Sequence, residues 1–265
     1  MIKYISTSVG GLVLRGTAHI PDKGKQRYPT VLMFHGFAST RNEVFNSFVE
    51  MSRVLNMDGI AAVRFDFGCH GESDGDFSNF IFTQELQEGA ALVEFAKTLD
   101  FVEPYNLSLL GMSLGSVAAS MTAGKYPNAI KSLCMWSPAT VFVDEIVNKH
   151  ILQGRTTDEV QQVGYFDFNS LKLGPKFFED VKHIHPYQVA VPFTGPVIII
   201  HGDADNIAPI KYAKRYSDFY QQDIKLVVVS GASHAWNTVS VKEALIRETR
   251  QFFKETLMDN DVKKL

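Results

Sequence analysis

The sequence predicts an α/β fold in which a mostly parallel central sheet is flanked by helices and interrupted by one inserted lid. Two observations carry this prediction. Short, continuous apolar runs alternate along the chain with segments of helical periodicity, and such runs are typical of strands covered on both faces of a parallel sheet. The alternation stops only once, between Trp136 and Val197. A chain of 265 residues is long enough for one large domain with such an insertion.

The expected elements follow in chain order. An antiparallel hairpin opens the chain, with strands at 2–8 and 12–20 joined by the turn signal Gly10-Gly11. The strands expected after it are 30–34, 60–65, 107–110, 130–136, 197–200 and 224–229. The expected helices are 44–57, 82–99, 116–125, 210–220 and 241–257, the last with apolar residues at helical spacing.

The interruption divides the chain into a core, residues 1–137 and 192–265, and an inserted segment, residues 138–191. A connection of this length is well beyond an ordinary loop, and long loops often carry function. The segment is rich in aromatic residues, namely Phe142, Tyr165, Phe166, Phe168, Phe177, Phe178 and Tyr187. We therefore expect a lid; the alternative is a structural excursion that does not contact substrate.

Composition and charge exclude several classes of partner. A formal net charge of −3 gives no reason to expect nucleic acid or an anionic membrane surface. No apolar segment reaches the roughly 20 residues that a membrane span needs, and residues 1–10 lack the pattern of a signal peptide. Cys69 and Cys134 form neither a disulfide framework nor a metal-ligand pattern. We therefore expect a reducing, cytoplasmic location.

The motif Gly111-Met112-Ser113-Leu114-Gly115 stands between a predicted strand and a predicted helix. A Gly-x-Ser-x-Gly sequence in this context is the nucleophile elbow of serine hydrolases. The turn is so tight that only glycine at the two outer positions avoids collision with neighbouring backbone. We expect the Ser113 hydroxyl to stand exposed above the sheet as the nucleophile.

A serine hydroxyl needs a histidine to remove its proton, and a carboxylate to hold that histidine. Two acids, Asp203 and Asp205, follow the predicted strand 197–200, and His234 follows the next predicted strand. The chain order serine, acid, histidine is that of this fold class, and active sites gather where the carboxyl ends of the strands meet. Asp205 is preferred as the acid, since Asp203 is suited to hydrogen-bonding the tight turn itself.

An oxyanion hole requires two backbone N–H donors near the nucleophile. His35-Gly36-Phe37 directly follows the predicted strand 30–34, so the N–H groups of Phe37 and Leu114 are the expected donors. The alternative is a simple turn at Gly36 that ends the strand.

The segment from Asp66 to Gly75 is a polar, glycine-rich loop after the strand 60–65. Taken alone, it indicates a turn in which Asp66 bonds local backbone. Cys69 beside His70 suggests a thiol nucleophile, but neither an elbow nor a paired acid accompanies it, so an inert thiol is expected. The pair His183 and His185 lacks a third ligand in sequence reach, so no metal is expected.

Together these motifs resemble the α/β-hydrolase fold family over almost the full length of the chain. The matching features are His35-Gly36-Phe37, the 66–75 loop, the 111–115 elbow, the 201–205 segment and His234. Within the family, residues 65–75 are similar to bacterial cinnamoyl (feruloyl) esterases with a small inserted lid. That resemblance implies hydrolysis of carboxylic esters, hydroxycinnamates included, without a cofactor. It also matches the catalytic acid to Asp205 and a polar lid contact of the acyl group to Asp144.

Two departures from those esterases bear on the substrate. Phe177 and Phe178 stand where a tyrosine hydroxyl is usual, and a missing hydroxyl removes a hydrogen-bond partner for a phenolic acid. Cys69 replaces a more common small polar residue. These changes weaken the expectation of a hydroxycinnamate substrate but leave the hydrolase class in place.

The sequence therefore predicts a serine carboxylesterase that forms an acyl-enzyme on aromatic or small acyl esters. Expected contacts of the acyl group in the lid are Phe142, Asp144, Phe177 and Phe178. Expected partners are a small-molecule ester and, as an option, a second copy of the chain in a homodimer. Three alternatives stay open: an acylglycerol lipase, an acyl thioesterase, and a non-catalytic binding protein on the same fold.

Overall fold

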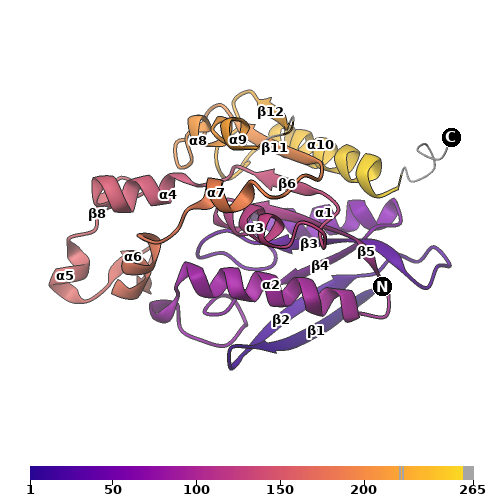
Figure 1. Ribbon diagram of the computed structural model, residues 1–265, viewed down its shortest axis with the longest axis horizontal. Helices are drawn as coiled ribbons and strands as arrows, with labels where there is room; N and C mark the ends of the chain where they lie inside the picture. Colours follow the sequence, from indigo (N-terminus) through magenta and orange to yellow (C-terminus); the bar gives the residue numbers. More distant parts are fainter. Residues whose placement is uncertain (221, 223, 259–265) are drawn as a thin grey trace.

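The computed structural model describes residues 1–220, 222 and 224–258, and a sheet of eight strands forms its centre (Figure 1). The strand order is β1-β2-β4-β3-β5-β6-β11-β12. These strands are β1 (Ile2–Val9), β2 (Leu12–His19), β3 (Tyr28–Phe34), β4 (Ala61–Phe65), β5 (Val102–Met112), β6 (Leu133–Trp136), β11 (Val197–Gly202) and β12 (Lys225–Val229). The α/β fold predicted from the sequence is confirmed.

Only the opening hairpin departs from parallel pairing among the described strands of this sheet. β1 pairs antiparallel with β2, and β2 pairs antiparallel with β4. From β4 onward each neighbouring pair is parallel. The carboxyl ends of β3, β5, β11 and β12 therefore meet at one edge of the sheet, which is where an open α/β sheet places its site.

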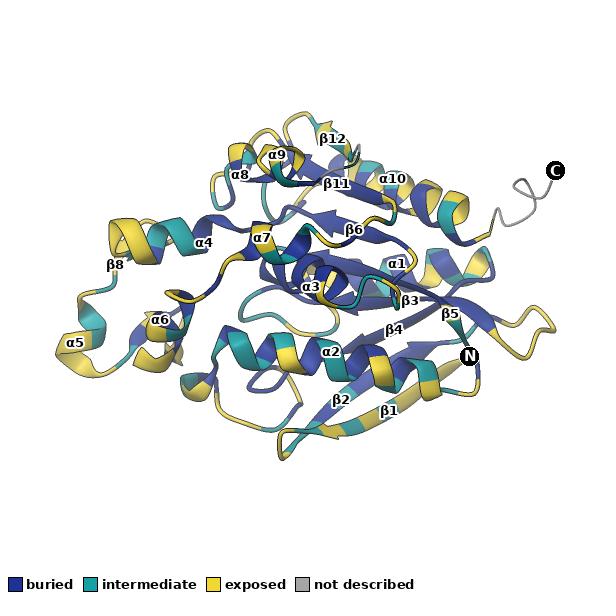
Figure 2. Ribbon diagram, viewed as in Figure 1, coloured by how far each residue is buried: buried dark blue, intermediate teal, exposed yellow. Residues whose placement is uncertain are grey.

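Helices cover both faces of the sheet (Figures 1 and 2). They include α1 (Ser47–Met57) and α10 (Val239–Leu257) on one face, and α2 (Phe82–Thr98), α3 (Leu114–Lys125) and α7 (Pro186–Ala190) on the other. Strand β3 shows why: Val31 and Met33 belong to one core cluster, while Leu32 and Phe34 belong to the other. Successive side chains of a strand point to opposite faces, so its continuous apolar run supplies two cores.

Several predicted elements differ in extent from the observed ones, and three examples follow. The helix expected over 44–57 opens as a 3-10 turn, η1 (Val44–Asn46), and α1 begins at Ser47, since Phe45 and Asn46 have left-handed backbone with φ of 52° and 57°. Strand β5 begins at Val102 rather than at 107. The helix expected over 210–220 consists of two short helices, α8 (Ile210–Lys214) and α9 (Tyr216–Phe219).

Most of the segment predicted as an insertion, residues 138–191, projects at one end of the molecule, while its last helix, α7, packs on α3 (Figure 1). It holds short elements: α4 (Val141–Asp144), the π-helix η3 (Glu145–Lys149), β7 (Ile151–Leu152), β8 (Arg155–Thr156), α5 (Glu159–Val163), β9 (Phe166–Phe168), β10 (Leu171–Leu173), α6 (Pro175–Val181) and α7. The 3-10 turn η2 (Phe77–Asn79) precedes α2 in the core. Asp180 of α6 accepts the backbone N–H of Thr83 at 2.8 Å, so the insertion supplies the cap of α2.

Two properties of the described residues bear on partners. No helix within them combines the length and the hydropathy that crossing a bilayer requires. Their His, Cys, Asp and Glu side chains do not gather in groups of three or more that could hold a metal ion.

Candidate active site

Ser113 lies at the junction of β5 and α3, in the elbow that the sequence predicts. Its backbone has φ 55° and ψ −118°, a conformation in which a residue other than glycine is strained. The flanking glycines explain how the turn fits. A Cβ at Gly111 would lie 2.4 Å from the Cα of Ser116, and one at Gly115 would lie 2.2 Å from the carbonyl oxygen of Phe34. The elbow therefore excludes any larger residue at both positions.

The structure brings Ser113, His234 and Asp205 together from the ends of three strands. The Oγ atom of Ser113 lies 2.9 Å from Nε2 of His234. Nδ1 of the same imidazole lies 2.8 Å from Oδ2 of Asp205. The Asp205 side chain is fully buried, while 18% of the His234 side chain is exposed. This chain of hydrogen bonds has the geometry by which a buried carboxylate orients a base toward a hydroxyl.

Asp205 and Asp203, the two candidate acids, have different surroundings. Asp205 accepts two further hydrogen bonds at Oδ1, from the N–H groups of Ile207 (3.0 Å) and Ala208 (2.8 Å). Burial opposes its ionisation, but the hydrogen bond from His234 and these donors outweigh it, so the pKa of Asp205 lies below the ordinary value. Asp203 instead accepts the N–H of Gly231 at 2.6 Å. The structure thus joins Asp205, and not Asp203, to the histidine.

The expected oxyanion donors belong to two residues near Ser113, Phe37 and Leu114. Phe37 follows β3, and a Cβ at Gly36 would lie only 3.2 Å from the Cβ of Ser113. Leu114 is the first residue of α3, so its N–H is among those left without a partner inside the helix. Phe37, Ser113 and Leu114 line one cavity together.

Two hollows flank Ser113. The smaller has a volume of about 40 Å³ and mostly apolar walls. It is lined by Phe37, Leu114, Ala139, Val141, Phe142, Glu145, Leu152, Gln153, Phe177 and Ile207. The larger, of about 370 Å³, is reached by His234 and is lined also by Ser39, Glu43, Val44, Phe168, Asn169 and Leu171.

The predicted lid contacts divide into two groups. Phe142 and Phe177 line the smaller hollow, where Phe177 stacks on Phe37 with ring centroids 5.4 Å apart. Phe178 turns away and packs edge-on against Phe177, with centroids 5.5 Å apart. Asp144 also lies outside the hollow: its carboxylate accepts the Tyr212 hydroxyl and pairs with Lys149 at 2.7 Å.

Glu145, which the sequence reasoning missed, lines the smaller hollow in place of its neighbour Asp144. Successive residues of a helix differ in direction by about 100°, so only one of two adjacent carboxylates faces the cavity. Oε2 of Glu145 accepts the N–H of Gln153 at 2.8 Å. Burial raises its pKa above the ordinary value. The sequence signal for this position is the pair of adjacent acids. The orientation of the helix then decides which of the two carboxylates faces the hollow.

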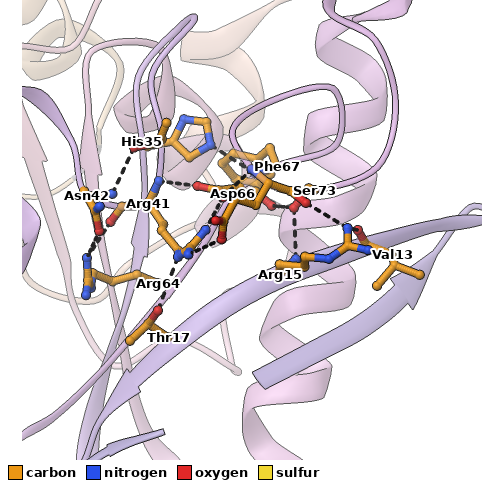
Figure 3. Close-up of polar contacts among 12 residues, drawn as sticks. Val13, Arg15, Thr17, His35, Arg41, Asn42, Arg64, Asp66, Phe67 and Ser73 are labelled. Atoms are coloured by element: carbon orange, nitrogen blue, oxygen red, sulfur yellow. Dashed lines mark hydrogen bonds and ion pairs between the residues drawn. The ribbon is translucent and has the colours of Figure 1, made fainter. Parts of the chain in front are cut away.

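The 66–75 loop is tied to the core by a buried ion pair. The Asp66 carboxylate is fully buried, accepts the N–H of Glu72 at 2.9 Å and pairs with the guanidinium of Arg41 (Figure 3). Gly71 lies against this carboxylate, where a Cβ would be 2.4 Å from its Cγ. Burial raises the pKa of the Cys69 thiol to about 11, so this thiol is not an ionised nucleophile at neutral pH.

Comparison with known proteins identifies a family. Residues 25–157, half of the chain, match the family model described as serine aminopeptidase, S33. Among curated proteins, the chain is 23% identical over 218 residues to the mitochondrial palmitoyl-protein thioesterase ABHD10 of Mus musculus, covering 79% of this chain and 70% of that one. It is 22% identical to an uncharacterized 31.7 kDa protein of Escherichia coli, covering 76% of this chain and 81% of that one.

Among solved structures, the fold is similar to Est1E from Butyrivibrio proteoclasticus with ferulic acid bound. The TM-score is 0.87 and the identity 26%, over 96% of this chain and 99% of that one. The fold is also similar to alpha/beta hydrolase domain-containing protein 10 from mouse, with a TM-score of 0.77 and 18% identity over 96% of this chain and 99% of that one.

Proposed function

Because the chain belongs to the serine aminopeptidase S33 family of α/β-hydrolase-fold serine hydrolases, we propose that it is a carboxylic ester hydrolase with Ser113 as its nucleophile. The observation that carries the proposal is the hydrogen-bonded series from Ser113 Oγ through the His234 imidazole to the Asp205 carboxylate. A serine hydroxyl without such a base is a weak nucleophile.

The reaction proceeds in two halves. His234 Nε2 takes the Ser113 proton while Oγ attacks the ester carbonyl, and the Asp205 carboxylate stabilises the resulting imidazolium. The N–H groups of Phe37 and Leu114 hold the oxyanion of the tetrahedral intermediate. His234 then gives its proton to the departing alcohol, which leaves the acyl group on Ser113. A water activated by the same imidazole releases the acid.

The two hollows support an assignment of the two parts of the ester. The departing oxygen must lie within hydrogen-bond reach of His234 Nε2, and His234 lines the larger hollow. The alcohol therefore occupies the larger hollow. The carbonyl oxygen lies between Phe37, which lines both hollows, and Leu114, which lines the smaller one. The acyl group therefore enters the smaller, apolar hollow.

The smaller hollow favours a flat or short acyl group. Its walls include the rings of Phe37, Phe142 and Phe177, and offset or edge-on contacts of aromatic rings are favourable. The Glu145 carboxylate supplies a hydrogen-bond acceptor for a phenolic hydroxyl. Bound ferulic acid in Est1E is consistent with this assignment. We therefore propose aromatic, hydroxycinnamoyl-type acyl groups, and short acyl groups as the second substrate class.

The inserted segment, residues 138–191, is proposed as a lid on the core of residues 1–137 and 192–265. Leu152 and Gln153 on the β7–β8 hairpin line the smaller hollow, together with Phe142 and Phe177 from two other parts of the insertion. These residues cover the smaller hollow from the side of the insertion, as the residues of a lid would.

The test is a panel of esters that vary one part at a time. Methyl p-coumarate and methyl cinnamate differ only in the phenolic hydroxyl, and p-nitrophenyl acetate and palmitate differ in acyl length. Palmitoyl-CoA tests the thioesterase alternative, for which the similarity to ABHD10 is the reason. Ser113→Ala is the control for every substrate.

We expect hydrolysis that Ser113→Ala abolishes, with coumarate preferred over cinnamate and acetate over palmitate. Glu145→Gln should narrow the coumarate preference by about tenfold, since a hydrogen bond to a charged acceptor contributes about 1.5–3 kcal/mol. A preference for p-nitrophenyl palmitate or palmitoyl-CoA would instead indicate an enzyme that acts on long acyl chains. Hydrolysis that survives Ser113→Ala would refute it.

A further inference from the structure

Glu43 is a buried carboxylate that the reaction described above does not use. It lies in the connection between β3 and α1, with 7% of the residue exposed and a φ of 58°. Its Oε2 accepts the N–H of Gly36 at 2.7 Å. Its Oε1 accepts the hydroxyl of Ser39 at 2.9 Å and the N–H of Val44 at 3.0 Å. Burial raises its pKa, and these donors oppose that shift.

The contact between Glu43 and Gly36 lies one residue from an expected oxyanion donor. Gly36 precedes Phe37, and its Cα faces Ser113 so closely that a Cβ there would lie 3.2 Å from the serine Cβ. The same Cβ would lie 3.6 Å from Glu43 Oε2. Glu43 therefore touches the backbone immediately beside the nucleophile without touching the nucleophile.

Other contacts hold the start and the middle of this connection. At its start, the N–H of Phe67 donates to Nε2 of His35 at 3.0 Å. In its middle, Arg41 pairs with Asp66, and the guanidinium of Arg64 donates to the Arg41 carbonyl at 2.9 Å (Figure 3). Neither of these anchors reaches the Gly36 N–H, which donates to Glu43.

The connection is also strained. Ala38, Glu43, Phe45 and Asn46 all have positive φ, between 52° and 58°, a conformation that residues other than glycine adopt at an energetic cost. A strained segment keeps one conformation only when surrounding contacts determine it. The Glu43 carboxylate, with three donors converging on it, is such a contact.

We propose that Glu43 is a positioning residue. It holds Gly36 in place so that the Phe37 N–H points at the carbonyl oxygen of the substrate that Ser113 attacks. The proposal rests on the proposed function, since it concerns the oxyanion hole of the same reaction. An oxyanion donor acts only when it lies about 2.7–3.1 Å from the oxyanion, and removal of one donor lowers kcat by about 10²–10³-fold. Substitution of Glu43 loosens the Phe37 N–H without removing it, so kcat should decrease by less than it does when a donor is removed.

The experiment compares Glu43→Ala, Glu43→Gln and a matched control, Glu94→Ala. Glu94 is an exposed carboxylate on α2 that pairs with Lys97. On a short-chain aryl ester, Glu43→Ala should lower kcat by about 10–100-fold, within the limit set by loss of a donor. Glu43→Gln retains an acceptor for the Gly36 N–H and should recover most of kcat. Glu94→Ala should behave as wild type.

A second readout does not depend on activity. Amide hydrogen exchange at residues 36–37 should accelerate in Glu43→Ala and remain slow in Glu43→Gln, while exchange in α1 stays unchanged. Unchanged exchange at 36–37 in Glu43→Ala overturns the proposal, whether or not the protein is an esterase. Faster exchange with unchanged kcat also overturns it. If wild type lacks Ser113-dependent hydrolysis, the proposed function fails, while the exchange experiment still decides whether Glu43 holds Gly36.

Discussion

Replacement of Asp205 by asparagine tests how the carboxylate controls the histidine. In the wild type, Oδ1 accepts the N–H groups of Ile207 and Ala208, and Oδ2 faces Nδ1 of His234. In Asp205→Asn the amide oxygen must stay with the two backbone donors. The amide nitrogen therefore faces His234 and donates to Nδ1.

This reversal changes the tautomer of His234. Nδ1 becomes the acceptor, so the proton moves to Nε2, which lies 2.9 Å from Ser113 Oγ. An imidazole protonated at Nε2 cannot accept the serine proton. Replacement of a triad aspartate by asparagine lowers kcat by about 10⁴-fold in a serine protease, which corresponds to about 5.5 kcal/mol of activation free energy. We expect about 10³–10⁴-fold here, with KM little changed.

The assay is p-nitrophenol release from p-nitrophenyl acetate, with Asp203→Asn as the matched control. Asp203 lies in the same loop and accepts the Gly231 N–H, without the hydrogen bond to His234 that Asp205 makes. Asp203→Asn should keep kcat within about threefold of wild type, because its role is in the turn. A decrease in kcat of less than tenfold in Asp205→Asn would refute the reasoning. So would a decrease in kcat that is larger in Asp203→Asn than in Asp205→Asn.

Two further predictions concern stability. His35 is 1% exposed, and burial lowers its pKa to about 4; the unfolded chain therefore binds this proton below about pH 6.5 and the folded chain only below about 4. The folded state should therefore lose stability as the pH is lowered from about 6.5 to about 4. Between pH 7 and pH 5, the free energy of unfolding measured in urea should decrease by about 2 kcal/mol more in wild type than in His35→Gln. Equal decreases would contradict the buried neutral imidazole. Gly115→Ala should lower the free energy of unfolding by about 3 kcal/mol or more and reduce kcat, since its Cβ would lie 2.2 Å from the Phe34 carbonyl oxygen. A variant with the melting temperature and kcat of wild type would contradict this close approach.

The sheet was predictable because each of its strands is a local feature. A continuous apolar run such as 197–200 indicates a strand covered on both faces, whatever lies elsewhere in the chain. The elbow was equally local, since glycine at 111 and 115 is required by contacts within that turn and with the adjoining strand. The approach of Ser113, Asp205 and His234 then follows from parallel strands ending at one edge.

The choice among neighbouring side chains was not predictable in this way. Asp144 and Glu145 are adjacent acids, and the orientation of a short helix decides that Glu145 faces the hollow. Glu43 is one polar residue in a polar run, and its contact with Gly36 depends on left-handed backbone at several non-glycine residues. No apolar period or turn signal marks either position, because both result from tertiary packing rather than local propensity.

The central claim, that Ser113 is a nucleophile activated by His234, is tested most directly by covalent labelling. The protein is treated with an alkyl fluorophosphonate, digested, and examined by mass spectrometry. We predict a single phosphonylated site at Ser113, with label lost in Ser113→Ala and strongly slowed in His234→Ala. Label at another residue, or wild-type labelling in His234→Ala, would contradict the account.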